Sequence, residues 1–392
     1  MKQRLMDILV CPVCGGRLCL VAFETKKNNF SDDYFKKGEP RCSYFCHKEN
    51  ISLIGNKSVV TDCVQCYKTE IEEGVLKCRC GRIYPITGDI PRMLQHFIDE
   101  DKAFLNRYKS ELSQAGYKVI PAQEKKSFFK THGQVQTVFG YQWLRYDDKY
   151  KTRKDEEFFE MQTGFTRKDL EGKLVLDGGC GMGRYSVIAQ SLGAEVIGLD
   201  LSKAVVKARE ITSAAPFIHI VQGNIMDPPF RDECFDAVFS LGVIHHTPDA
   251  SLAFSKLTRL LKKKAVFALW VYGKRHPLVH FIRTFERSIT TRMPHKVLYA
   301  LCYAAAPIGY VLHGLFYSKN RFLHRLAVLF MAVLPISPER YWRVRVQETF
   351  DWFAPRYQSH HKPEEVVGWF KREGYNLINV LPGDDAVKAV RQ

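Results

Sequence analysis

The chain has 392 residues, of which 46% are hydrophobic and 12% are aromatic. This composition excludes an intrinsically disordered chain, and the length predicts more than one domain. The formal net charge of +16 at pH 7 indicates either an anionic neighbour (nucleic acid, acidic lipid head groups or a phosphorylated substrate) or a basic surface that only keeps the protein in solution.

The N-terminus and the twelve cysteines indicate in which cellular compartment the protein works. The apolar run after Arg4 is short and meets Cys11 at once, so it does not resemble a signal peptide. Without such a signal, many cysteines indicate metal ligation in a reducing compartment rather than disulfides. We therefore expect a cytoplasmic protein.

Two pairs of closely spaced cysteines, which we call knuckles, lie near the two ends of the N-terminal region. Cys11 and Cys14 are followed by a glycine turn, and two thiolates at this spacing can grip one tetrahedral zinc from the same side. Cys78 and Cys80, separated by a single residue, are the expected partners. Four thiolates leave no open coordination position, which indicates a structural site.

The two ends of this region, residues 5–20 and 74–94, resemble the small zinc-ribbon family known as methyltransferase activators. The resemblance implies a zinc-ribbon domain over residues 1–96. Members of this family also occur fused ahead of methyltransferase domains. The resemblance therefore also implies a methyltransferase domain further along the chain.

Four more cysteines lie between the two knuckles. Cys42 and Cys46 form a C-x-x-x-C pair, and Cys63 and Cys66 form a C-x-x-C pair. These two pairs could close a second four-thiolate site nested inside the first, or the first knuckle could instead pair with Cys63 and Cys66. The sequence thus predicts one or two structural zinc ions, and cysteines grouped in pairs favour two.

The sequence predicts that residues 97–172 form a linker with entry helices, which precede the core. A basic, polar linker is expected from Lys125 to His132, followed by the aromatic segment Val138 to Trp143. In fused methyltransferases such a segment folds over the cofactor, which makes Tyr141 and Trp143 candidates for the acceptor site. The alternative is a helix that only packs against the sheet.

The organising segment of the chain runs from Leu174 to Asp200. A short apolar strand breaks at Gly178 and Gly179, a helix resumes at Arg184, and a second apolar strand ends on Asp200. Strand, glycine-rich turn, helix, strand and acid are the first half of a nucleotide-binding α/β unit. Further apolar runs alternate with helical stretches as far as residue 272, which predicts a doubly wound, mainly parallel sheet.

The spacing of the glycines indicates which ligand this unit takes. Gly179, Gly181 and Gly183 form G-x-G-x-G, and Arg184 takes the place of the third glycine of a dinucleotide fingerprint. Pyrophosphate requires bare backbone N–H groups with no carboxylate in the way. S-adenosylmethionine instead offers an ammonium, which Asp177 at the end of the strand can attract while the glycines let the backbone come close.

These features resemble the class I S-adenosylmethionine-dependent methyltransferases, which have a Rossmann-like core. The resemblance implies such a core over residues 173–272, with Asp200 accepting hydrogen bonds from the ribose. Asn224 follows the third apolar run, where that family usually has an acid near the adenine, and residues 235–249 look like its fourth motif. The residues expected to bind the cofactor are Asp177, Gly178, Gly179, Cys180, Gly181, Gly183, Asp200, Leu201, Asn224, Ile225 and Leu241.

Methyl transfer from a sulfonium is an in-line displacement that needs alignment and exclusion of water. A base is needed only where the acceptor must lose a proton. His245 and His246, directly after the fourth strand, are the candidates because imidazole titrates near neutral pH. The alternative is that one or both cap the next helix or face solvent.

Residues 273–345 interrupt the pattern of a compact methyltransferase. No Asp, Glu, Lys or Arg occurs from Val297 to Tyr317, and about 20 apolar residues can span a bilayer. A spanning helix would leave the end of the chain across the membrane from the core that it completes, and the segment contains Pro307. We therefore expect a helical lid over the acceptor pocket, which could rest on the inner face of a membrane.

The charges of this insertion fit a peripheral membrane contact. It contains twelve Lys or Arg residues against Glu286 and Glu339. Basic residues beside apolar helices suit anionic lipid head groups, or an acceptor with a long apolar part and a phosphate. The alternative is a basic lid whose apolar face is simply buried.

The last segment, residues 346–392, is expected to complete the core. A helix from Pro363 to Glu373 and a strand from Asn376 to Val380 would finish the sheet. The loop before them mixes charged and aromatic residues, which is typical of either a binding surface or an anchored loop. Its acceptor-site candidates are Asp351, Arg356, Tyr357 and His361.

The sequence as a whole predicts an α/β methyltransferase with an N-terminal zinc ribbon and a helical lid insertion. An enclosed pocket favours a small-molecule or lipid-linked acceptor. One alternative is an RNA methyltransferase, because zinc ribbons and positive charge also serve nucleic acids, although no basic stripe with interleaved aromatics stands out. Another is an inactive cofactor-binding scaffold that binds a partner protein through the ribbon.

Overall fold

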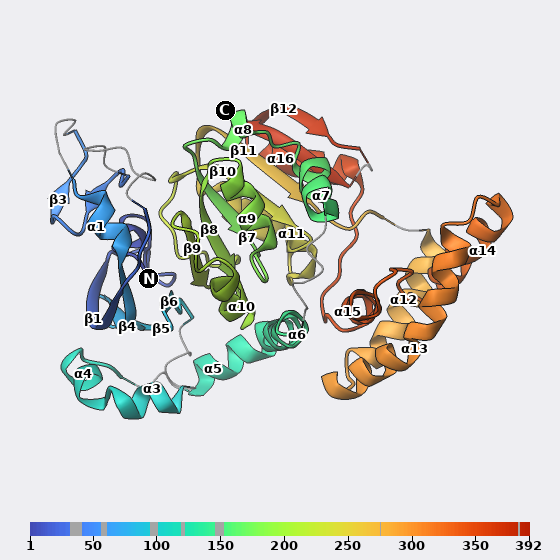
Figure 1. Ribbon diagram of the computed structural model, residues 1–392, viewed down its shortest axis with the longest axis horizontal. Helices are drawn as coiled ribbons and strands as arrows, with labels where there is room; N and C mark the ends of the chain where they lie inside the picture. The colour runs from blue at the N-terminus through green and yellow to red at the C-terminus, as the bar shows by residue number, and fades with distance from the viewer. Residues whose placement is uncertain are drawn as a thin grey trace.

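The computed structural model describes residues 1–31, 41–55, 61–94, 101–118, 122–145, 153–274, 276–382 and 385–392. A small N-terminal domain, a central sheet covered by helices and a helical arm follow one another across the molecule (Figure 1). The chain ends at the far edge of the central sheet, away from the N-terminus.

The central sheet has seven strands in the order β12-β13-β11-β10-β7-β8-β9. The strands from β11 to β9 are parallel, whereas β13 runs antiparallel to both β11 and β12. This arrangement confirms the predicted doubly wound, mainly parallel sheet. The bounds are β7 Leu174–Gly178, β8 Glu195–Asp200, β9 Ile218–Gln222, β10 Phe235–Leu241, β11 Leu261–Trp270, β12 Tyr375–Val380 and β13 Ala386–Arg391.

Both faces of the sheet are covered, so its strands are apolar almost throughout. Val175 and Val196 belong to one buried cluster, and their neighbours Leu176 and Ile197 belong to another, because successive strand residues point to opposite faces. The helices and 3-10 turns around the sheet are α7 Arg153–Thr163, α8 Arg167–Leu170, α9 Arg184–Ser191, α10 Ala204–Ile211, η5 Ile244–His246, α11 Ala250–Thr258 and α16 Pro363–Arg372.

The N-terminal domain carries its own antiparallel sheet, in the order β1-β4-β5-β6. Beside this sheet, the peptide N–H of Met93 donates to the carbonyl of Gln222 at 2.7 Å. That bond, with a parallel bridge from Arg92 to Gln222, places the ribbon against β9, the edge strand of the central sheet. An edge that could pair with another chain is thereby covered. The bounds are η1 Gln3–Asp7, β1 Leu18–Lys27, β2 Phe45–Cys46, β3 Ile51–Ser52, α1 Cys63–Lys68, β4 Thr69–Cys78, β5 Ile83–Thr87 and β6 Ile90–Pro91.

The connection between the two sheets is more helical than the sequence predicts. The expected linker from Lys125 to His132 forms the end of α5 and most of a π-helical turn, which continues into α6. That prediction was wrong because lysine and phenylalanine tolerate a helix and no glycine interrupts the segment before Gly133. The bounds are α3 Lys102–Arg107, α4 Lys109–Gln114, α5 Ala122–Phe128, η3 Phe129–Gly133 and α6 Gln134–Trp143.

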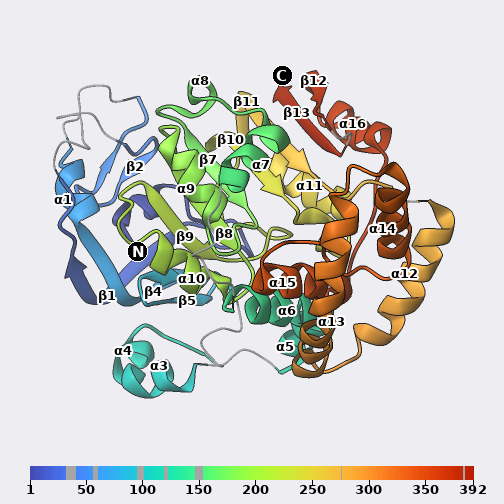
Figure 2. The same cartoon turned by 45° about the vertical axis from the view of Figure 1, so that its right-hand side comes forward.

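The expected helical insertion follows β11 and consists of α12 Pro277–Thr290, α13 His295–Phe316, α14 Arg321–Val333 and α15 Trp342–Phe353. Helix α15 runs across the predicted end of the lid at residue 345. Within the described ranges, α13 is the one helix long and apolar enough to cross a membrane. Helices α6, α13 and α15 lie side by side under the sheet (Figure 2), where the Gln347 amide donates to the Gln142 carbonyl at 3.1 Å.

Candidate functional site

A cavity of about 790 Å³ opens at the carboxyl ends of the parallel strands. Its floor is formed by the segments that follow β7, β8, β9 and β10, and α6 and α15 contribute its cover. Ligands of open α/β sheets bind at this end of the strands.

The glycine loop after β7 lines this cavity. Gly179 and Gly181 have positive φ angles of 95° and 53°, which L side chains rarely adopt. A Cβ on Gly179 would lie 2.4 Å from the methyl groups of Val243, and one on Gly181 would lie 3.3 Å from the Trp143 indole. The loop therefore needs its glycines, and its backbone can approach a ligand closely.

Asp200 ends β8 and lines the cavity. One carboxylate oxygen accepts from the Gly181 peptide N–H at 2.9 Å, and the other accepts from the peptide N–H and hydroxyl of Ser202 at 2.8 and 2.7 Å. Burial raises the pKa of this carboxyl above its ordinary value. Asp200 thus fixes the loop and presents acceptor oxygens to the cavity, an arrangement that fits the hydroxyls of a ribose.

Asp177 lies outside the cavity lining. Strand β7 continues to Gly178, so the Asp177 side chain points into the layer between sheet and helix, where it accepts from the Ser186 hydroxyl at 2.6 Å. Burial raises its pKa to about 7. Gly178 and Gly183 also lie off the lining. Besides Asp200, the lining near the loop includes Asp155, which pairs with Arg184 at 3.0 Å.

The remaining predicted cofactor residues lie where the sequence expects them. Asn224 lines the cavity after β9. Its side-chain oxygen already accepts from the Met226 peptide N–H at 3.0 Å. Its amide nitrogen, 3.5 Å from His132 Nε2, is therefore the group more available to the nucleobase of a ligand. The other predicted residues in the lining are Cys180, Leu201, Ile225 and Leu241.

The two adjacent histidines are placed differently. His246 lines the cavity, and its Nδ1 donates to the Tyr357 carbonyl at 2.9 Å, since a carbonyl can only accept. His245 lies off the cavity, stacked on Tyr272, whose peptide N–H donates to His245 Nδ1 at 3.3 Å. Burial lowers the pKa of both imidazoles. The structure thus brings one of the two candidate bases to the cavity.

The candidate acceptor-site residues also fall into two groups, those that line the cavity and those that do not. Trp143 and Asp351 line the cavity, and the Tyr272 hydroxyl donates to Asp351 at 3.3 Å. Tyr141 instead packs against Phe350 in a cluster between α6 and α15. The other three lie off the lining: Arg356 donates to the Lys130 carbonyl, Tyr357 contributes its own carbonyl to His246, and His361 lies 2.9 Å from a Glu365 oxygen.

Several cavity residues were not anticipated from the sequence. Glu348 on α15 accepts from the Ser337 hydroxyl at 2.5 Å, and burial raises its pKa to about 7. Gln142 Oε1 and Trp270 Nε1 are buried atoms with no hydrogen-bond partner among the described residues. Buried polar atoms are normally paired, so these two are positions where a ligand would bond. The other unanticipated members of the lining include Glu339, Tyr341, Gln347 and Trp352.

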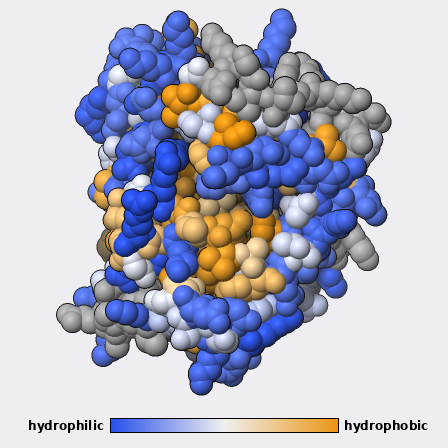
Figure 3. Space-filling view, turned by 90° about the vertical axis from the view of Figure 1, so that its left-hand side faces the viewer, coloured by the Kyte–Doolittle hydropathy of each residue, from blue (hydrophilic) through white to orange (hydrophobic). Residues whose placement is uncertain are grey.

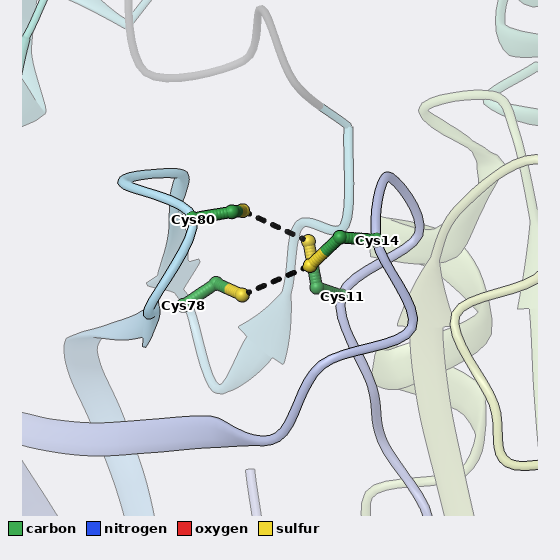
Figure 4. A group of neighbouring side chains, drawn as sticks. All are labelled: Cys11, Cys14, Cys78 and Cys80. Atoms are coloured by element: carbon green, nitrogen blue, oxygen red, sulfur yellow. Dashed lines mark hydrogen bonds between the residues drawn. The ribbon is translucent and has the colours of Figure 1, made fainter.

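The two N-terminal knuckles come together at the start of the ribbon (Figure 4). The sulfurs of Cys11, Cys14, Cys78 and Cys80 all lie within 4.8 Å of one another. A Cβ on Gly16 would lie 3.1 Å from the Cys14 sulfur and 3.3 Å from the Cys78 sulfur. Four converging thiols in a space kept open by a glycine fit zinc, and the short spacing of the second knuckle does not prevent it.

The second set of cysteines does not converge in the same way. In the described ranges, which include Cys42, Cys46, Cys63 and Cys66, no further group of three potential ligand atoms lies within 4.8 Å. The first knuckle pairs with Cys78 and Cys80 rather than with Cys63 and Cys66. A second zinc site therefore stays a prediction.

Comparison with known families assigns both parts of the chain. Residues 176–269 match the family described as a methyltransferase domain, and residues 2–89 match the family described as Trm112p-like protein. Together with the strand order and the glycine loop, these matches identify the core as a class I S-adenosylmethionine-dependent methyltransferase domain. The ribbon ahead of it is a Trm112p-like domain, so the chain joins the two in one polypeptide.

Individual relatives are similar over the core. "Sterol methyltransferase-like 2" of Botryococcus braunii is 34% identical over 116 residues, which is 28% of this chain and 30% of that protein. A protein of Mycobacterium ulcerans described as a phthiotriol/phenolphthiotriol dimycocerosates methyltransferase is 35% identical over 105 residues, 26% of this chain and 41% of that one. The chain thus spans less than half the length of these relatives.

Among solved structures, similarity extends to a complex between the Haloferax volcanii Trm112 methyltransferase activator and a chain described as a methyltransferase. The match is 26% identical, covers 31% of this chain and 58% of that chain, and has a TM-score of 0.26. A methyltransferase of Mesorhizobium loti is 25% identical over 27% of this chain and 48% of that chain, also with a TM-score of 0.26.

Proposed function

We propose that this protein transfers a methyl group from S-adenosylmethionine to a small or lipid-linked acceptor in the cavity beneath α15. The observation that carries the proposal is the position of His246, which faces a cavity bounded by the glycine loop on one side and by α15 on the other. Alignment of donor and acceptor in a closed space is most of what this chemistry needs.

The residues at the loop end of the cavity fit the cofactor. Asp200 offers carboxylate oxygens to ribose hydroxyls, Asn224 offers its amide to a base, and the Gly181 backbone allows close approach. Bound there, S-adenosylmethionine supplies an electrophilic methyl group on a positively charged sulfur. Trp143 lies over the loop and helps to exclude water from that end of the cavity.

His246 supplies the base where the acceptor must lose a proton. Its Nδ1–H is committed to the Tyr357 carbonyl, and burial lowers the imidazole pKa, so the neutral ring carries its lone pair on Nε2. A proton leaving an acceptor hydroxyl or amine would pass to Nε2 as the new bond to carbon forms. The leaving group would be a neutral thioether, so the chain would need to supply no acid.

The acceptor end of the cavity combines aromatic walls with a few polar groups. Phe139, Phe158 and Trp352 contribute aromatic surface, while Glu348 and Asp351 contribute carboxyls. A cavity of about 790 Å³ lies within the range of about 300–1,000 Å³ typical of small-molecule sites. Relatives named for sterol and phthiotriol methyl transfer support an acceptor with a large apolar part.

A labelling experiment tests this function. The full-length protein would be incubated with methyl-labelled S-adenosylmethionine and cell extract, and label would be followed into organic-phase, aqueous small-molecule and RNA fractions. We expect label in the organic or small-molecule fraction, and none with Asp200→Ala, which removes the cavity's cofactor-facing acid. Nuclease-sensitive label would instead indicate an RNA methyltransferase. Cofactor binding without any transfer would indicate a scaffold.

A further inference from the structure

The helical insertion presents an unusual amount of apolar surface to solvent. Most of the large apolar side chains that are exposed in the described ranges lie between Leu278 and Trp342. Phe281 is 69% exposed and Phe322 is 71% exposed. These side chains lie on neighbouring helices, since α14 packs against both α12 and α13. Large apolar patches on a surface usually mark a site of interaction.

These side chains recur along each helix at intervals of three, four or, once, seven residues, which is the spacing of neighbours on one helix face. We call this set the apolar platform. Its members are Leu278, Phe281, Phe285 and Ile289 on α12, Val297, Leu301, Ile308 and Val311 on α13, and Phe322, Leu326, Leu329 and Val333 on α14.

The inner faces of the same helices are already occupied. Cys302 and Ala306 of α13 are buried in one cluster with Val346 and Phe350 of α15. The Arg345 guanidinium of α15 donates to the Ala306 carbonyl at 2.9 Å. Since α13 is held to the body of the protein along one side, its exposed side is available to something outside the chain and the helix does not stand free as a membrane span.

The charges around the platform have one sign. In the part of residues 276–345 that the structure describes, no Asp or Glu is exposed, because Glu286 pairs with Arg283 at 3.4 Å and Glu339 is half-buried. The exposed cations there are Arg292, Lys296, Lys319, Arg321, Arg325, Arg340 and Arg343. Apolar helix faces beside cations complement a surface of anionic head groups over acyl chains.

We propose that the apolar platform docks on an anionic lipid bilayer, with α12, α13 and α14 lying in the plane of the interface. A second copy of the chain is a poorer occupant. A two-fold interface sets each patch against itself, so the cations around one platform would meet those of the other. A bilayer instead offers acyl chains to the aromatic side chains and phosphates to the cations.

This position would bring the membrane next to the acceptor cavity. Helix α15 packs on α13 through Val346 and Phe350 and contributes Gln347, Glu348 and Asp351 to the cavity. An acceptor anchored in the bilayer would have to cross only this helical layer. That consequence rests on the proposed methyl transfer, whereas docking itself requires neither cofactor nor acceptor.

Co-sedimentation of the full-length protein with vesicles tests the docking. We expect binding to phosphatidylcholine vesicles that contain phosphatidylglycerol, and weak binding to phosphatidylcholine alone. Phe281→Ser/Phe285→Ser and Phe322→Ser/Leu329→Ser should each weaken binding by about tenfold or more, because each removes two inserted side chains. The matched control Val206→Ser/Leu252→Ser changes two exposed apolar residues on α10 and α11 and should leave binding unchanged.

A second variant tests the cations independently, because it leaves the apolar helix faces intact. Arg321→Gln/Arg325→Gln should weaken binding to anionic vesicles by about tenfold at low salt, with a smaller effect at high salt. Equal binding by all variants, or no binding to either vesicle, would overturn the proposal. So would a stable dimer that ignores vesicles and dissociates on Phe281→Ser/Phe285→Ser, because a second copy would then cover the platform. None of these results depends on methyl transfer.

Discussion

The two additions to the methyltransferase core are joined to it in different ways. The ribbon shares a buried apolar cluster with the sheet and adds buried charges to this contact. Glu195 of β8 lies 3.1 Å from Arg4 and 3.1 Å from His219, and it accepts from the Tyr67 hydroxyl at 2.6 Å. The insertion meets the core through apolar helix faces and leaves a second apolar face in solvent.

The outer surfaces differ as well. The side of the molecule that carries the ribbon is largely hydrophilic, with apolar residues gathered around a central hollow (Figure 3). The insertion shows exposed phenylalanines along helices α12 and α14. Glu195, at the contact between ribbon and sheet, has its partners within the chain, which fixes the position of the ribbon. The insertion leaves apolar side chains exposed, and there we propose an external partner.

The cluster of Cys11, Cys14, Cys78 and Cys80 gives the largest expected effect on the ribbon side. Cys14→Ser should release the metal and unfold the ribbon, since structural zinc contributes about 10–16 kcal/mol of apparent binding free energy in small zinc domains. Metal analysis and circular dichroism would measure both. Cys19→Ser, which changes an exposed cysteine outside the cluster, should leave both unchanged. Metal analysis of the unaltered protein would also test the predicted second site, because two zinc ions per chain would show that Cys42, Cys46, Cys63 and Cys66 bind metal as well.

The proposed base, His246, gives a test of the cavity beneath α15. His246→Gln should lower kcat by about a hundredfold to ten-thousandfold and leave S-adenosylmethionine affinity unchanged. Burial lowers the pKa of His246 from its ordinary value of 6.5, so the imidazole stays neutral at a pH below that value. The rate should therefore persist to more acidic pH than a free imidazole would allow. His280→Gln, on the exposed face of α12, is the control. An unchanged kcat would mean that the acceptor needs no base.

Substitution of Glu195, at the contact between ribbon and sheet, should have a large effect on stability. Glu195→Gln should lower the free energy of unfolding by about 1–3 kcal/mol, because Arg4 would lose one of its two buried carboxylate partners and keep only Asp7. The exposed Glu171→Gln should cost less than about 1 kcal/mol. Arg4 and its neighbours hold the Glu195 pKa below its ordinary value of 4.5, so the difference should shrink as the pH falls below that value. Equal unfolding midpoints for the two variants would contradict the comparison.

Glu348 on α15 predicts the smallest effect, with the opposite dependence on pH. A carboxyl whose pKa rises to about 7 on folding stabilises the protein below 4.5, and this contribution is lost as the pH rises through 7. Glu348→Gln should therefore raise the free energy of unfolding by on the order of 1 kcal/mol near pH 8, with little change near pH 4. Urea unfolding at the two pH values would show it. A variant less stable near pH 8 would mean that the carboxylate is needed in its charged form.

What the sequence could predict depended on how local the signal was. The glycine loop, Asp200 and Asn224 follow strands directly, so their position at one end of the sheet could be expected. The orientation of Asp177 could not, because it depends on where β7 ends and on Ser186 in the next helix. The sequence analysis predicts no strand after Val380, yet Ala386–Arg391 forms the antiparallel strand beside β11.

Contacts between distant segments account for the other differences. Glu348 enters the cavity because α15 turns back under the sheet, and no local pattern marks that return. Arg4 and Glu195 are 191 positions apart in the sequence, so their pairing at 3.1 Å could not be anticipated from either neighbourhood. Local motifs were sufficient for the class of protein, whereas the joints between its parts required the structure.

We propose that S-adenosylmethionine binds in the cavity between the glycine loop and α15. Native mass spectrometry of the purified protein, before and after addition of the cofactor, would test this binding. We predict one S-adenosylmethionine or its demethylated product per chain, lost on Asp200→Ala while the zinc is retained. A chain that carries no adenosyl ligand, and takes up none when it is added, would contradict the account.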